Sequence, residues 1–291
     1  MGLVLCLLLG LASCSTTDFV TGQQVYNLYT IQDDVQLGQS ALKGNLTQLR
    51  QQGVKVNQDP ARVAQLRSIM RRLTTASDRP GLPYDVTLIH TGIVNAAAFP
   101  GGQMIVFEGL YDPKKGLAQT DDEIAAVMAH EIAHVNCRHS TERLSCVMPM
   151  AMITEVGAAV AEYNDNKQLA DGLRIAFAAG SSILIPMYSR KDEFEADRVG
   201  LFYMAKAGFD PRAAPRIWKR VADKGSDGNA ISIFATHPSS GDRYKALNAI
   251  LPYAMDEYAK STGSYPKDYS YTRPMGTPKT FDWRLPQARE R

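Results

Sequence analysis

Two histidines four residues apart carry the clearest chemistry in the sequence, in the segment His130-Glu131-Ile132-Ala133-His134. Residues four apart on a helix lie on one face, so both imidazoles can bind the same metal ion. Glu131 is rotated about 100° from His130, which suits a group that stands beside the ion and takes a proton from water. This HExxH pattern is the one that zinc peptidases use, and it predicts a catalytic zinc site.

The flanking residues predict one amphipathic helix over 121–144. Thr120 followed by Glu123 has the form of a capping box at its start. The range 121–144 contains neither proline nor glycine. A histidine pair on a helix is otherwise a surface or core feature, and the capped amphipathic context favours the metal site. The apolar stripe consists of Ile124, Val127, Met128, Ile132 and Val135.

A catalytic zinc site needs a third protein ligand and one open position. Three acidic residues compete for this role in a helix predicted from about Tyr188 to Ala207, namely Glu193, Glu195 and Asp197. Glu193 and Asp197 are four apart and share a face, whereas Glu195 points away from it. We therefore expect Glu193 to bind zinc and Asp197 to accept a hydrogen bond from a ligand histidine. The alternative is an ordinary solvated helix face.

Composition sets broad limits. The chain has 291 residues, of which 45% are hydrophobic and 21% charged, with a net charge of +2. These values are typical of one large globular domain or two small ones. The small net charge, without a run of Lys or Arg, gives no indication of nucleic-acid binding. Helices are predicted from Ile31 to about Gln52 and from Asp59-Pro60 onward.

Two short strands are predicted before the HExxH helix, at 84–90 and 103–108, and we expect them to form a hairpin-like sheet. The second strand is the candidate edge that binds an extended peptide by strand addition, and the alternative is an edge strand without a ligand. After the helix, the apolar residues 148–187 predict a helical hairpin packed over the core or flanking the cleft. Arg174 and Gly172 argue against a membrane-spanning helix. The candidate substrate strand is Gln103, Met104, Ile105, Val106 and Phe107.

The N-terminus predicts export. Residues 1–13 contain an apolar run of about ten residues, too short to span a bilayer and typical of a signal peptide. The run ends in small residues before Cys14, which resembles a bacterial lipobox with Cys14 as the lipidated residue. Ser15 resembles the sorting signal for the outer membrane. The alternative is a simple cleaved signal peptide. Residues 14–30 are expected to form a tether.

Two further cysteines, Cys137 and Cys146, are nine residues apart. A continuous helix would separate them by about 13 Å, beyond disulfide reach, so we expect buried free thiols. A disulfide remains the alternative if the chain turns near Ser145.

Several segments together resemble peptidase family M48. They are HEIAH, YSRKDEFEAD, AGFDP and VNAAAFPGG, and the resemblance covers about residues 30–250. It implies an α+β, mainly helical, zincin-like domain with a small antiparallel sheet, which we place at 31–255. It also implies one zinc ion held by His130, His134 and Glu193, with Glu131 as catalytic base and Asp197 beside a ligand histidine. The turn NAAAFPGG departs from the NAFA-PGG form common in the family.

The segment 236–243 resembles the THPxxxDR segment of the same family. We expect His237 or Arg243 to stabilise the tetrahedral oxyanion, or His237 to take the fourth zinc position at rest. The alternative is a set of hydrogen bonds that fixes this loop. Residues 256–291 are rich in proline and tyrosine, and we expect an extended C-terminal tail.

The resemblance implies a zinc metalloendopeptidase that degrades misfolded or stalled envelope proteins in the bacterial periplasm. Lipidated Cys14 would anchor it to the outer membrane, and the outer-membrane assembly machinery is a further candidate partner. The alternative is a zinc-binding, chaperone-like factor for outer-membrane protein assembly whose protease activity is weak or latched.

Overall fold

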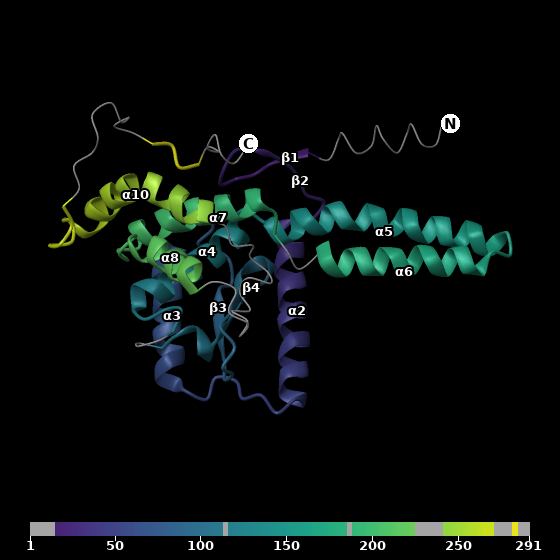
Figure 1. Ribbon diagram of the computed structural model, residues 1–291, viewed down its shortest axis with the longest axis horizontal. Coiled ribbons are helices and arrows are strands. Elements are labelled where there is room, and N and C mark those ends of the chain that lie inside the picture. The colour runs from purple at the N-terminus through teal and green to yellow at the C-terminus, as the bar shows by residue number, and fades with distance from the viewer. Residues whose placement is uncertain (1–14, 113–115, 185–187, 225–240, 271–280, 285–291) are drawn as a thin grey trace.

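The computed structural model describes residues 15–112, 116–184, 188–224, 241–270 and 281–284. Helices dominate, and a small sheet lies among them (Figure 1). This is the α+β, mainly helical class that the sequence predicted. The helices are α2 (Ile31–Gln51), α3 (Pro60–Thr75), α4 (Asp121–Asn136), α5 (His139–Tyr163), α6 (Lys167–Leu184), α7 (Arg190–Lys206), α8 (Ala213–Lys224) and α10 (Gly241–Thr262).

The predicted helix starts are confirmed by their caps. The side chains of Thr30, Asp59 and Ser189 each accept a hydrogen bond from the backbone N–H three residues later. Thr120 caps α4 in the same way through the N–H of Glu123. The Glu123 carboxylate accepts from the Gln119 N–H and pairs with a distant arginine, so the expected reciprocal capping box is only half formed.

The sheet corrects one prediction. The two predicted strands exist, but β3 pairs with β5 in parallel rather than as a hairpin. A short strand, β4, pairs antiparallel with β5, and the order β3-β5-β4 makes β5 central. The predicted peptide-binding strand therefore has neighbours on both sides. A separate two-stranded sheet lies near the start of the described chain. The strands are β1 (Ser15–Thr17), β2 (Gln24–Tyr26), β3 (Asp85–Ile89), β4 (Ala96–Ala98) and β5 (Gln103–Phe107), with 3-10 turns at Pro100–Gly102 and Glu108–Leu110.

Helix α4 lies at the centre of the domain. Every residue from Glu123 to Asn136 is buried, and α3, α7, α8 and β4 pack around it. The small residues Ala125, Ala129 and Ala133 are completely buried, which lets these neighbours approach closely. Each large apolar side chain buried in such a core contributes about 1.5–3 kcal/mol. The packing of these neighbours therefore fixes the position of the motif helix without a bound metal.

Helix α4 ends earlier than the sequence predicted. The continuous helix expected over 121–144 breaks at Arg138, which adopts a left-handed backbone with φ of 60°. Its guanidinium bonds to Asp34 at 2.6 and 3.0 Å and to the carbonyl of Tyr29. Arg79 donates to the carbonyl of Asn136 at 2.9 Å. These partners come from distant parts of the chain, so the local sequence does not reveal the break.

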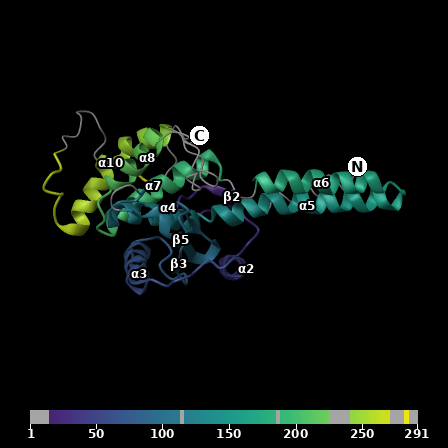
Figure 2. The same ribbon diagram turned by 60° about the horizontal axis from the view of Figure 1, so that its bottom comes forward.

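Helices α5 and α6 form the predicted hairpin, but its placement differs from the prediction. The hairpin projects away from the rest of the molecule rather than covering the core (Figures 1 and 2). Its base is attached through Asn27, whose side chain donates to Thr141 at 3.1 Å, and through the N–H of Leu28, which donates to Ser145 at 2.8 Å. The residues expected to form a loose tether are thus partly a β-hairpin fastened to α5.

A close approach explains the glycine in α2. A Cβ atom on Gly38 would lie 1.8 Å from the carbonyl oxygen of Pro100, so the turn before β5 packs directly on the α2 backbone. Both cysteines are free, as expected; Cys137 is buried, but Cys146 is exposed, contrary to prediction. At the other end of the chain, α10 extends past residue 255, and Trp283 stacks on Phe202 of α7 with ring centroids 5.4 Å apart.

Candidate active site

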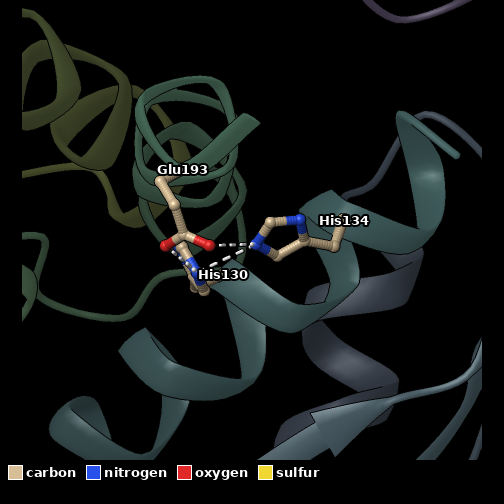
Figure 3. A group of neighbouring side chains, drawn as sticks. All are labelled: His130, His134 and Glu193. Carbon is tan, nitrogen blue, oxygen red and sulfur yellow. Dashed lines mark hydrogen bonds and ion pairs between the residues drawn. The ribbon is translucent and has the colours of Figure 1, made fainter. Parts of the chain in front are cut away.

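The three predicted metal ligands converge. His130 and His134 lie on one face of α4, and Glu193 reaches them from the first turn of α7 (Figure 3). The Nε2 atoms of the two histidines are 3.1 Å apart. Each Nε2 lies 3.5 Å from an oxygen of the Glu193 carboxylate. All three side chains are buried, so the surrounding protein packing holds them in place.

These separations fit a zinc ion. Zinc binds histidine nitrogen and carboxylate oxygen at about 2.0–2.2 Å in a tetrahedron, whose ligand atoms then lie about 3.3–3.5 Å apart. The observed 3.1, 3.5 and 3.5 Å agree with that geometry. Two imidazoles and one carboxylate form the His2Glu donor set of catalytic zinc sites, which leaves one position for water or substrate.

Glu131 lies next to this cluster and is aimed by the sheet. Its Oε2 accepts a hydrogen bond of 2.9 Å from the backbone N–H of Ala98 in β4. The side chain is buried, beside the ligand on the preceding residue. A carboxylate in this position can accept a proton from an attacking water and deliver it to a leaving group. The edge strand and the proposed base are thus in direct contact.

Asp197 lies beside His130, in the position expected of a residue that orients a ligand histidine. Its Oδ1 lies 3.0 Å from Nδ1 of His130, one turn after Glu193. Burial would raise the pKa of Asp197, but the nearby Arg243 and His130 outweigh it and lower the pKa. Burial alone would lower the pKa of His130, but the carboxylates of Asp197 and Glu193 have the larger combined effect and raise this pKa. Asp197 is therefore ionised and fixes the tautomer of His130, with Nδ1 protonated and Nε2 directed at the metal position.

Arg243 lies behind the ligands and is fully buried. Its Nε and Nη2 donate to the Asp197 carboxylate at 2.6 Å each, Nη1 donates to Glu193, and the guanidinium stacks 3.5 Å from the ring centre of Trp218. Burial disfavours its charged form, but the adjacent carboxylates dominate and raise its pKa. This placement favours a role in holding Glu193 and Asp197. The predicted alternative, contact with a substrate oxyanion, stays a prediction.

The environment of His134 contains residues that sequence reasoning missed. Its Nδ1 lies 2.8 Å from Nδ1 of His139, whose Nε2 faces Glu195 at 3.6 Å. Burial raises the pKa of Glu195, but His139 outweighs it and lowers the pKa to about 2. Tyr188 stacks on the His134 ring at 3.8 Å. The prediction that Glu195 points away from the metal ligands agrees with this position. The sequence did contain one indication of this environment, because His139 follows the last residue of the motif by only five positions.

Cys137 also lies near His139 and Glu195. Burial raises the pKa of its thiol well above the ordinary value, which favours the neutral thiol. Two predicted functional residues, Cys14 and His237, lie outside the described residues.

The fold and the site define a metallopeptidase centre. The model of peptidase family M48 matches residues 60–251, about two thirds of the sequence. The chain belongs to this family.

Curated relatives agree with this assignment. The chain is 35% identical over 187 residues to the mitochondrial metalloendopeptidase OMA1 of Schizosaccharomyces pombe, which covers 64% of this chain and 52% of that protein. It is 28% identical over 207 residues to the beta-barrel assembly-enhancing protease of Escherichia coli K12, covering 69% and 42%. It is 32% identical over 189 residues to the putative beta-barrel assembly-enhancing protease of Vibrio cholerae, covering 64% and 38%. The chain spans about half the length of these relatives or less.

Proposed function

We propose that this protein is a zinc-dependent endopeptidase that cleaves misfolded or stalled proteins of the bacterial envelope. The convergence of His130, His134 and Glu193 beside Glu131 carries the proposal, because a structural metal site has no use for a carboxylate base. When bound at these ligands, zinc would polarise the scissile carbonyl and make water easier to deprotonate. The residues of the chain supply the remaining steps.

The substrate is best accommodated along β4. This strand pairs with β5 on one side, and no described strand pairs with its other side. The backbone N–H and carbonyl groups of a strand alternate in direction. Phe99 donates to Gln103 of β5, so the groups of the neighbouring Ala98 face the other way, where its N–H reaches Glu131. An extended peptide aligned with this edge would pass the catalytic base.

Glu131 performs the proton transfers in this proposal. Its carboxylate is held by the Ala98 N–H at 2.9 Å and stands next to the ligand His130. It takes a proton from the attacking water and passes it to the amine of the departing peptide. Asp197 and Arg243 keep the ligand side chains in position while this happens.

The envelope setting is also part of the proposal. The signal-like residues 1–13 and the lipobox-like Cys14 support export and lipid anchoring. The similarity to beta-barrel assembly-enhancing proteases supports protein substrates and a link to outer-membrane assembly. Labelled palmitate incorporated by the wild type and not by Cys14→Ser would support the anchor. No incorporation in either would refute it.

The test of the activity compares wild type with Glu131→Gln for bound zinc and for cleavage of casein. Glutamine has nearly the same size and leaves the three ligands in place. We expect zinc binding to persist and cleavage to fall by about two to four orders of magnitude. Cleavage that survives would show that Glu131 is not the base. Zinc binding without cleavage in the wild type would favour the chaperone-like alternative or a latched site.

A further inference from the structure

The hairpin of α5 and α6 has an unusual surface. Beyond its base it extends away from the domain in both views, and its two helices pack against each other (Figures 1 and 2). Most of the exposed large apolar side chains among the described residues lie here, with exposed fractions of 47–68%. They are Met148, Met150, Met152, Ile153, Val156, Val160, Leu169 and Ile175, and Tyr163 at the end of α5 is 89% exposed.

The fully buried part of the contact between the two helices is made of small residues. Ala158, Ala161 and Ala170 form a buried cluster of their own. Gly157 faces Leu173 of the other helix, and a Cβ there would lie 3.5 Å from that side chain, in ordinary van der Waals contact. A hairpin built for water places its large apolar residues inside, because burial from water drives its folding. Small residues inside and large apolar residues outside are typical of helices that pack in lipid.

Three charged side chains in the middle of the hairpin pair with one another. Arg174 of α6 donates to Glu155 at 3.1 Å and to Glu162 at 2.7 Å, both on α5. The Thr154 hydroxyl donates to the carbonyl of Met150 within the helix. Ionisable groups in a hydrocarbon environment are found paired in this way. The polar run 164–168 forms the turn between the helices and the first residues of α6.

Among the described helices, α5 alone has the length and apolar composition of a helix that could cross a bilayer. Helix α5 has 25 residues, and its most apolar window of 18 residues has a mean hydropathy of 1.6, with only 17% of that window buried. A helix needs about 20 predominantly apolar residues to cross the hydrocarbon core. From the sequence, Arg174 counted against a membrane-spanning helix, but in the structure this side chain forms ion pairs with Glu155 and Glu162.

We propose that the α5–α6 hairpin inserts into a lipid bilayer, with acyl chains covering its outward apolar side chains. The N-terminal segment supports lipid as the occupant. Ser15, the residue after Cys14, begins the β-hairpin that leads to Asn27 and Leu28 at the base of α5. An acyl chain on Cys14 would therefore enter the membrane close to the hairpin. The choice of lipid as the occupant rests in part on the proposed lipid anchor at Cys14, and it does not depend on the proposed peptidase activity.

A fluorescent probe at one hairpin position tests the proposal. The full chain is prepared with Cys6, Cys14 and Cys146 replaced by serine, so that no acyl anchor is present. An environment-sensitive dye is then attached to Ile153→Cys on α5 or, as the matched control, to Ile93→Cys in the loop between β3 and β4. Both isoleucines are exposed. Vesicles of phosphatidylethanolamine and phosphatidylglycerol are added, with or without nitroxide groups on the acyl chains.

We expect the dye at position 153 to brighten severalfold with vesicles and to be quenched by the acyl-chain nitroxides, and the dye at position 93 to change little. Adding Val156→Glu and Val160→Glu should reduce the vesicle response at position 153 at least tenfold. Bound zinc in each variant reports that the domain remains folded. A dye at 153 that ignores vesicles would overturn the proposal. Brightening that follows protein concentration and not lipid would also overturn it, because a second copy would then cover this face.

Discussion

Substituting Gly200 by alanine should weaken metal binding without removing a ligand. Gly200 lies where α7 crosses α4, and a Cβ there would meet the carbonyl carbon and oxygen of Ala129 and the nitrogen of His130, each at 3.0 Å. Ordinary non-bonded contacts of carbon lie at about 3.5 Å or more. The obstructing atoms are backbone in a buried helix and cannot rotate away. The two helices must therefore separate by about 0.5 Å.

That displacement acts directly on the metal site. His130 and His134 are on α4, whereas Glu193 is on α7, two turns before Gly200. Metal–ligand distances tolerate only about 0.2 Å of change. We expect zinc affinity to fall about 10- to 100-fold, within the range seen when supporting residues of a metal site are altered. Overpacking of the core should also lower the free energy of unfolding by about 1–3 kcal/mol.

The assay is competition for zinc with a chelator of known affinity, at fixed pH, together with thermal unfolding of the metal-free protein. Gly44→Ala is the control, because a Cβ there meets no atom within 4 Å. It lies inside α2 and should raise stability by about 0.5–1 kcal/mol with zinc affinity unchanged. If Gly200→Ala binds zinc as tightly as the wild type, the helix contact does not set the ligand geometry and the reasoning fails.

Three other predictions concern the site and its surroundings. Asp197→Asn should reduce zinc affinity about 10- to 100-fold, because His130 loses the carboxylate 3.0 Å from its Nδ1; unchanged affinity in chelator competition would contradict this. Removing zinc with a chelator should lower the melting temperature and stop casein cleavage, and added zinc should restore both. Asp18→Asn should stabilise the protein at neutral pH, since burial raises the pKa of Asp18 above 3.8 and its hydrogen bonds all converge on Oδ1, which asparagine keeps. Because the pKa of Asp18 is raised in the folded wild type, the wild type loses stability as the pH rises through that pKa. The gain in stability of Asp18→Asn should therefore vanish toward pH 3. A gain in urea titrations that does not change with pH would count against this account.

The sequence alone was sufficient to predict which side chains of the candidate site lie together. Ligands four apart on one helix, a carboxylate beside them and a second acidic pair four apart depend only on helix periodicity, which local patterning reveals. His130, His134, Glu193 and Asp197 therefore lie as expected. Helix starts were equally predictable, because a capping side chain bonds within three residues of its own position.

The tertiary structure decided features that depend on partners far along the chain. Helix α4 ends before Arg138 because that side chain bonds to Asp34, about a hundred residues earlier. The predicted strand 103–107 is central rather than an edge, because β3 and β4 pair with it on its two sides. The sequence did not reveal β4, because this strand is short and consists of alanine. These non-local pairings carry no signal in local periodicity.

Charge and apolar surface show the same division. Composition identified Arg174 as a charge in an apolar segment, but only the packing of α6 on α5 shows that Glu155 and Glu162 meet it. Arg243 was recognised in its segment, yet its position behind Glu193 and Asp197 follows from the packing of α10 on α7. Residue types and spacing determined which groups can do chemistry. The packing of distant helices determined which of them face the metal, which support it and which side chains remain outside the core.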